Sequence, residues 1–130
     1  MIVLDASVVL EILLGSVRGL AIAEEVLLSE ESLHAPWLLD AEVANAMRRV
    51  WLRGELTPQR GQEALQDLTD LPIHRHGHAG LVERAWQLRD SLTAYDAFYI
   101  ALAENLPATL LTGDARLSRA PGHSARVELR

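Results

Sequence analysis

The sequence contains no cysteine and no lysine. Without cysteine the chain can form neither disulfides nor thiolate metal sites, and we expect a reducing, cytoplasmic location. Without lysine it cannot contain a Gly-Lys-Ser/Thr phosphate-binding loop or use a lysine nucleophile or Schiff base. A phosphoacceptor receiver domain, which needs a lysine, is excluded as well. All twelve basic residues are therefore arginines.

Length and composition predict one globular domain that spans residues 1–130. Hydrophobic residues make up 49% of the chain, enough for a core and too many for a disordered protein. The first residues have no basic leader, and Asp5 and Glu11 interrupt the first apolar run. We therefore expect neither a signal peptide nor a membrane span.

The net charge of −6 is unusual for a protein that binds nucleic acid, because such proteins usually present a basic face. Four acids identified below as candidate metal ligands account for four of these negative charges. Bound divalent cations would offset the charge at the place where a polyanion would bind. The acidic balance therefore does not exclude a nucleic-acid substrate.

Short apolar runs alternate with helical patterns along the whole chain. Strands are predicted at residues 2–5, 32–35, 72–75, 109–112 and 127–129. Helices are predicted at residues 7–14, 19–28, 37–53, 57–71, 81–90 and 93–105. This order predicts an α/β fold with a mainly parallel sheet and helices on both faces.

The predicted helix at residues 7–14 is apolar on more than one face. It is either buried within the domain or part of a protein interface. Three tryptophans, Trp37, Trp51 and Trp86, are predicted to pack between helices rather than to stack on bases. The alternating His74, His76 and His78 are assigned to a strand end and loop, because no acid or cysteine beside them would complete a zinc site.

Two acids lie at the ends of predicted parallel strands. Asp5 ends the first strand, and Asp114 follows the strand at residues 109–112. Since ligands of open α/β sheets bind beyond the carboxyl ends of the strands, both side chains should project from one edge. Each acid could instead cap the helix or turn that follows it.

Two further acids lie on predicted helices. Asp96 belongs to a helix that is apolar on nearly every side, where a carboxylate is costly unless it is paired or bound to metal. A capping box with Thr93 is the alternative. Glu42 lies at the edge of an apolar helix face, where Asn45 could hydrogen-bond it, although a solvated glutamate is common at such an edge.

Together the four acids indicate a site for hard divalent cations. Mg²⁺ and Mn²⁺ prefer oxygen ligands, and such ions neutralise phosphate charge and activate water. No competing nucleophile arrangement is present, because the chain has no cysteine and no Gly-x-Ser-x-Gly elbow.

Four stretches of the chain match a known family in order and spacing. They are Ile2-Val3-Leu4-Asp5-Ala6-Ser7, Leu38-Leu39-Asp40-Ala41-Glu42-Val43-Ala44-Asn45-Ala46-Met47-Arg48-Arg49, Leu92-Thr93-Ala94-Tyr95-Asp96-Ala97-Phe98-Tyr99-Ile100-Ala101-Leu102-Ala103 and Leu110-Leu111-Thr112-Gly113-Asp114. With these residues the chain resembles the PIN-domain family, and within it the VapC-type toxins of type II toxin–antitoxin pairs. The resemblance implies a PIN-like three-layer α/β fold over the whole chain.

The resemblance also implies an activity, a Mg²⁺- or Mn²⁺-dependent endoribonuclease that hydrolyses RNA phosphodiester bonds. The family's acidic positions are matched by Asp5, Glu42, Asp96 and Asp114, and its principal metal ligands by Asp5 and Asp96. Polar positions often found beside the metal are matched by Ser7 and Thr112.

The partners that the resemblance implies are an RNA substrate, a second copy of the chain in a homodimer and a cognate antitoxin, with no membrane. The alternative function is a non-catalytic PIN-like module that binds RNA or a protein without cleavage. That alternative predicts that acids of the set are lost, whereas all four are present.

Overall fold

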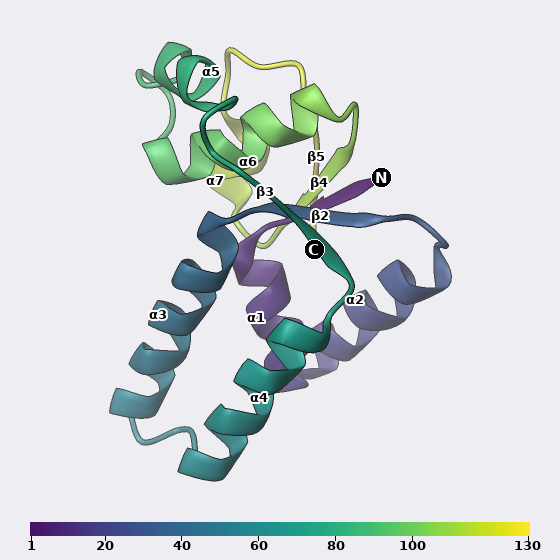
Figure 1. The fold of residues 1–130 in the computed structure, drawn as a ribbon, viewed down its shortest axis with the longest axis vertical. Coiled ribbons are helices and arrows are strands. Elements are labelled where there is room, and N and C mark those ends of the chain that lie inside the picture. The colour runs from purple at the N-terminus through teal and green to yellow at the C-terminus, as the bar shows by residue number, and fades with distance from the viewer.

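Five parallel strands form the centre of the protein, which we describe over residues 1–130 from a computed structural model (Figure 1). The strands are β1 (Ile2–Leu4), β2 (Leu33–Pro36), β3 (Ile73–His76), β4 (Thr109–Thr112) and β5 (Arg126–Leu129). Their order in the sheet is β3-β2-β1-β4-β5, and every neighbouring pair is parallel. All five predicted strands are present, each within one residue of its predicted ends.

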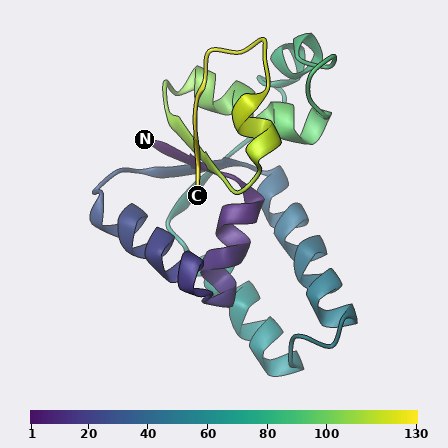
Figure 2. The same cartoon turned by 180° about the vertical axis from the view of Figure 1, so that it is seen from behind.

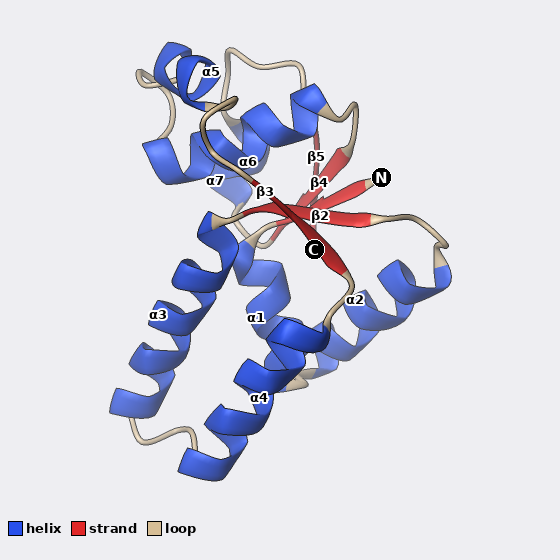
Figure 3. Cartoon of the chain, viewed as in Figure 1, coloured by secondary structure: helices blue, strands red, loops and turns tan.

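Seven helices cover the two faces of this sheet, as Figures 2 and 3 also show. On one face lie α1 (Ala6–Leu14), α2 (Val17–Leu28), α3 (Leu38–Leu52) and α4 (Pro58–Asp70). On the other lie α5 (Val82–Gln87), α6 (Ala94–Asn105) and α7 (Ala115–Arg119). The predicted three-layer α/β architecture is confirmed.

Each face has its own hydrophobic core, because successive strand residues point to opposite sides. In β1, Ile2 and Leu4 belong to the core under α1–α4, whereas Val3 between them belongs to the core under α5–α7. A buried strand that is apolar on both faces is typical of a central parallel strand. The position of β1 therefore follows from its unbroken apolar run.

Local signals set the ends of several helices. The helix α1 ends at Gly15, whose φ of +66° lies in the left-handed region that glycine tolerates. The helix α4 begins after Thr57, whose hydroxyl accepts from the Arg60 amide at 3.1 Å. The helix α5 is shorter than predicted, since the chain after Gln87 turns through residues 88–92 before α6.

Burial explains the excess of apolar side chains in α1. Val8 and Val9 are fully buried and Leu13 nearly so, and α1 packs against α2, α3 and α4. Of the two interpretations of this helix, burial within the domain is the one that the structure supports. No single helix is long and apolar enough to cross a membrane, and α1 and α2, which pass that test only together, are bent by 109°.

The prediction that the three tryptophans pack between helices is wrong. Trp37, Trp51 and Trp86 expose 63%, 48% and 67% of their surface. Trp37 precedes α3 at the carboxyl edge of the sheet, and Trp86 stacks on the exposed guanidinium of Arg89 at 4.7 Å. Trp51 lies in the last turn of α3 and lines an open groove between α3 and α4, which leaves half of it exposed.

Candidate active site

Two of the four predicted acids, Asp5 and Asp114, follow adjacent strands at the carboxyl edge of the sheet. Leu4 of β1 is paired with Leu111 of β4, and the Asp5 amide donates to the Leu111 carbonyl at 3.0 Å. The two strand ends are thus fixed side by side by the backbone register, as the alternating sequence pattern predicted.

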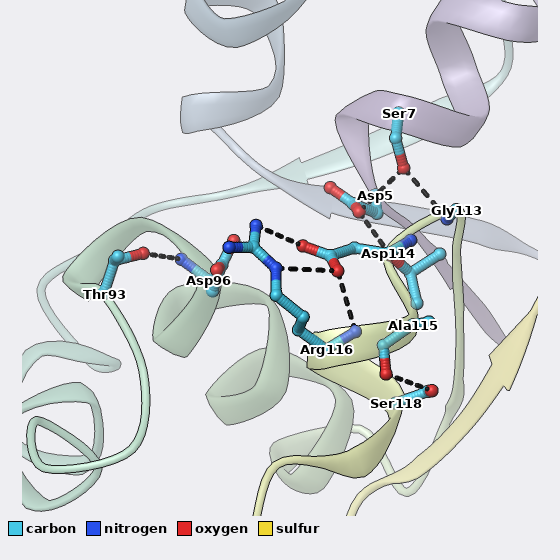
Figure 4. Close-up of polar contacts among 10 residues, drawn as sticks. Asp5, Ser7, Thr93, Asp96, Gly113, Asp114, Ala115, Arg116 and Ser118 are labelled. Carbon is cyan, nitrogen blue, oxygen red and sulfur yellow. Dashed lines mark hydrogen bonds and ion pairs between the residues drawn. The ribbon is translucent and has the colours of Figure 1, made fainter.

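The Asp5 carboxylate is held by two hydroxyls. Ser7 Oγ donates to Asp5 Oδ2 at 2.9 Å, and Thr112 Oγ1 donates to the same oxygen at 2.5 Å (Figure 4). Asp5 is buried and Thr112 is completely so. Because both hydroxyls bind Oδ2, the second carboxylate oxygen, Oδ1, has no hydrogen-bond donor and is free to bind a cation.

The same hydroxyls also fix the loop after β4. Ser7 Oγ accepts from the Gly113 amide and Thr112 Oγ1 accepts from the Asp114 amide, each at 3.0 Å. A hydroxyl that donates to a carboxylate and accepts from an amide uses both of its hydrogen-bonding roles. Ser7 and Thr112 thereby connect Asp5 to the loop that carries Asp114.

Glu42 is oriented by Tyr99 of α6. Tyr99 is fully buried, and its hydroxyl donates to Glu42 Oε1 at 2.8 Å. Asn45 was expected to fill this role, but it is exposed and forms no hydrogen bond with Glu42. Tyr99 reaches Glu42 from α6, whereas Asn45 faces solvent.

Asp96 lies in the first turn of α6. Its backbone amide donates to Thr93 Oγ1 at 3.2 Å, which caps the helix, but its carboxylate does not bond the Thr93 amide. Only half of the alternative capping box is therefore formed. The Asp96 carboxylate accepts no backbone hydrogen bond, and only the Thr93 hydroxyl and the Arg116 charge act to lower its pKa.

Asp114 has two roles. Its Oδ1 accepts from the Arg116 amide at 2.8 Å and so caps α7, as the capping alternative predicted. The Arg116 guanidinium also pairs with Asp114, with Nη2 3.1 Å from Oδ2, and extends toward Asp96 (Figure 4). Capping and membership of the acidic cluster are thus compatible in this residue.

The pKa values of the acids show that they act on one another. Burial raises the pKa of Glu42, and the negative charges of Asp5 and Asp96 raise it further. Burial also raises the pKa of Asp96, together with the charges of Asp5 and Asp114. By contrast, the hydrogen bonds from Arg116 lower the pKa of Asp114. Acids on four elements distant in sequence therefore share one electrostatic environment.

The residues present fit a hard divalent cation. Their oxygens carry concentrated negative charge, and Asp5 Oδ1, Glu42 Oε2 and both Asp96 oxygens lack hydrogen-bond donors. As the side chains stand, no three acids or histidines lie close enough together to share one ion. The acids face a common region but have not closed around a centre.

The histidines form a separate group. His34 Nδ1 lies 2.9 Å from His76 Nε2, and the rings of His34 and His74 stack at 5.1 Å between centroids. His78 accepts from the Leu38 amide at 2.9 Å and stacks on Phe98. They occupy β2, the edge strand β3 and the loop after it, as predicted for His74–His78.

Sequence reasoning missed Tyr99 and Arg116. A buried tyrosine hydroxyl generally has a hydrogen-bond partner, and Tyr99 lies three residues after Asp96 on the same side of α6, so its link to the acids could have been inferred. The signal for Arg116 was its place two residues after Asp114, within reach of that carboxylate.

Comparison with known proteins places this geometry in a family. Residues 2–123 match the family model of the PIN domain. The ribonuclease VapC1 of Mycobacterium tuberculosis is 44% identical over 128 residues, which are 98% of this chain and 96% of that protein. The ribonuclease VapC12 of the same organism is 39% identical over 99% of this chain and 98% of its own length.

Two solved structures share the fold at low sequence identity. VapBC2 from Rickettsia felis, bound to a DNA fragment from its promoter, superposes with a TM-score of 0.70 at 15% identity, covering 99% of this chain and 98% of that one. Mycobacterium tuberculosis VapC20, a toxin that cleaves the sarcin–ricin loop, gives 0.67 at 16% identity, covering 91% and 93%. From the family match and the near full-length identity to VapC proteins, the chain belongs to the PIN-domain family and, within it, to the VapC ribonucleases.

Proposed function

We propose that this chain is an endoribonuclease that hydrolyses RNA phosphodiester bonds with Mg²⁺ or Mn²⁺, and that it is the toxin of a toxin–antitoxin pair. The observation that carries the proposal is the shared electrostatic environment of Asp5, Glu42, Asp96 and Asp114, in which the first three retain oxygens without donors. A non-catalytic module would gain nothing from keeping mutually repelling acids together, since they destabilise the folded chain.

Asp5 and Asp96 would be the principal ligands of the ion, and Glu42 and Asp114 would complete its surroundings or hold a second one. A bound ion of this kind neutralises phosphate charge and lowers the pKa of an attacking water. The chain's own residues prepare for it. Ser7 and Thr112 fix Asp5 through Oδ2 and leave Oδ1 free, and Tyr99 does the same for Glu42 through Oε1.

The proposed reaction is tested by cleavage of RNA by the purified chain in Mg²⁺, in Mn²⁺ and in excess chelator. We expect cleavage with either metal, none in chelator, and a loss of at least about a thousandfold for Asp5→Asn, as is usual when a group that stabilises the transition state is removed. Asp90→Asn is the matched control, since Asp90 is exposed and forms no ion pair or side-chain hydrogen bond. Undiminished cleavage in chelator would contradict the metal-dependent mechanism.

Metal binding is measured independently by thermal melting. The ion should raise the melting temperature of the wild type and of Asp90→Asn by mass action, and that of Asp5→Asn much less. If the chain binds Mg²⁺ or Mn²⁺ in this way but cleaves none of a broad set of cellular RNAs, the non-catalytic alternative would replace the enzyme.

The partners are proposals as well. Apolar side chains remain exposed on α2, namely Val17, Leu20, Leu27 and Leu28, and a groove of about 540 Å³ between α3 and α4 is lined by Met47, Trp51, Leu56 and Leu65 among others. We expect a homodimer, and an antitoxin whose apolar segment covers part of this surface. Light scattering of the chain alone and with a co-expressed neighbouring protein tests both, and a strictly monomeric chain would refute the dimer.

A further inference from the structure

Most of the positive charge of this acidic chain is neutralised internally. Seven of the twelve arginines form ion pairs with carboxylates: Arg53, Arg60, Arg75, Arg84, Arg116, Arg126 and Arg130. The arginines without a carboxylate partner are Arg18, Arg48, Arg49, Arg89 and Arg119. A net charge of −6 repels a polyanion, so contacts to RNA phosphates must come from cations whose charge is not already matched.

Arg18 is the unmatched arginine that lies at the acidic cluster. A Cβ placed on Gly113 would lie 2.8 Å from Arg18 Nη2 and 3.2 Å from Ser7 Oγ. The guanidinium thus lies over Gly113, in the loop between Thr112 and Asp114, beside the hydroxyl that holds Asp5. Arg18 is exposed and donates to no group of the chain, so its planar set of donors faces solvent at the border of the site.

The position of Arg18 in its helix is electrostatically unfavourable. It lies in the first turn of α2 (Val17–Leu28), where the helix dipole disfavours a cation, and no acid occupies that turn. Ser16 alone caps the helix, by accepting from the Gly19 amide at 2.9 Å. An arginine at the positive end of a helix weakens the folded state slightly, and no acid of the same turn and no ion pair offsets this.

We propose that Arg18 binds an RNA phosphate next to the bond that is cut, and so positions the strand across Asp5 and Asp114. The inference rests on the proposed ribonuclease function and names one of its substrate contacts. An arginine fork matches the geometry of two phosphate oxygens, and a phosphate is the ligand that would supply the missing counter-charge. Gly113, which has no Cβ, leaves room for the guanidinium to lie against the loop.

The experiment compares Arg18→Gln and Arg18→Lys with Arg53→Gln. Arg53 is a matched control because it is also exposed and lies at the far end of α3, paired only with Glu55. RNA binding is measured by fluorescence anisotropy with a labelled single-stranded RNA and Mg²⁺, in an Asp5→Asn background that does not cleave. KM and kcat are measured in the chain that retains Asp5.

We expect Arg18→Gln to bind RNA roughly tenfold more weakly, the loss typical of one charge-assisted hydrogen-bonded contact, and to lower the slope of log Kd against log salt by about 0.7. KM should rise with kcat nearly unchanged. Arg18→Lys should keep the salt slope and lose only part of the affinity. Arg18→Gln should melt at or above the wild-type temperature, because it removes the unfavourable charge from the first turn of α2. Arg18→Lys keeps that charge and should melt at about the wild-type temperature.

Binding by Arg18→Gln equal to that of Arg53→Gln, or a fall in kcat at constant KM, would overturn the proposal. So would a variant that binds RNA normally and fails only to associate with a protein partner. Failure of the proposed function would look different, because the chain with intact Asp5 would then cleave no RNA. The anisotropy measurement would still show whether Arg18 contacts the strand.

Discussion

The two halves of the acidic cluster are stabilised in different ways. Asp5 and Glu42 are held by neutral hydroxyls, from Ser7 and Thr112 in one case and from Tyr99 in the other. Asp96 has no donor on its carboxylate, and Asp114 is bound by the charged Arg116. Asp5 is buried and Glu42 is half-buried, whereas the Arg116 side chain that pairs with Asp114 is 88% exposed.

The two kinds of partner have different effects on a carboxylate: one only orients it, and the other also neutralises its charge. A hydroxyl fixes a carboxylate in place and leaves its full negative charge for a cation, whereas an arginine cancels that charge. In the proposed site, Asp5 and Glu42 would therefore keep their full charge for a metal ion, at the cost of repulsion within the folded chain. In the other half, Arg116 is an exposed counter-ion that a metal ion would have to displace from Asp114.

Tyr99→Phe should have the largest effect, because it removes the only donor to Glu42 inside the domain. Without it the pKa of Glu42 rises further, so metal binding and cleavage should require a higher pH than in the wild type. A hydrogen bond to a charged group contributes about 1.5–3 kcal/mol, and we expect a loss of unfolding free energy of that order above the pKa of Glu42. Urea denaturation and the pH profile of cleavage measure the two effects.

Tyr95→Phe is the control, since Tyr95 is exposed and its hydroxyl has no partner. If Tyr99→Phe leaves the acid limb of the pH profile where it is in the wild type, the hydroxyl does not lower the pKa of Glu42. The two halves of the cluster would then not differ in how their carboxylates are held.

Asp96→Asn should have an intermediate effect, and one of opposite sign. The folded pKa of Asp96 lies above its ordinary 3.8, so ionisation weakens the fold as pH rises through that pKa, and the cost persists at neutral pH. Asparagine removes this cost. In chelator at pH 7 the variant should melt higher by roughly a few degrees, a gain that shrinks as pH falls toward 3.8.

Asp40→Asn provides the opposite case at the first turn of another helix. Asp40 lies in the first turn of α3 and pairs with Arg75 through both of its oxygens, so its neutralisation should lower the melting temperature. The Thr93 cap is no obstacle to the gain at Asp96, because it binds the Asp96 amide and survives the substitution. A lower melting temperature for Asp96→Asn in chelator would identify Asp96 as a cap rather than a ligand.

Arg116→Gln should have the smallest effect on stability, because the Arg116 side chain is 88% exposed and solvent screens its charge. The pKa of Asp114 should return toward its ordinary value once the guanidinium is gone. Metal binding should tighten severalfold, since no counter-ion competes for Asp114. Titration calorimetry with Mn²⁺ measures this change, with Arg53→Gln as control, and weaker binding would show that Arg116 supports the metal site instead of competing for it.

The five strands and six of the seven helices were predictable, because the spacing of their apolar residues matches the faces that each element buries; α7, five residues long, was predicted only as a short turn. The unbroken Ile2-Val3-Leu4 could only be a central strand with a core on each face, and the Thr57-Pro58 and Gly15 signals act within one turn of the backbone. Burial of the tryptophans was not predictable. Whether Trp51 is covered depends on how open the groove between α3 and α4 is, which the helix pattern does not encode.

Within the site, the sequence identified residues better than it identified their partners. Ser7 and Thr112 lie two residues from an acid, so their proximity to Asp5 and Asp114 followed from the strand register. The donor to Glu42 came from Tyr99 of α6 instead of from Asn45 in the same helix, because the tertiary fold decides which polar group meets the carboxylate.

The sequence by itself determined the alternation of strands and helices, the four acids, and the placement of Asp5 and Asp114 at the ends of β1 and β4, because each depends on local patterns and on the parallel register. Only the tertiary structure decided which cations are neutralised and which remain free. Charges act through space, so Arg116 and Arg18, two ordinary arginines in the sequence, become neighbours of the acidic cluster when α7 and α2 pack beside the loop at Gly113.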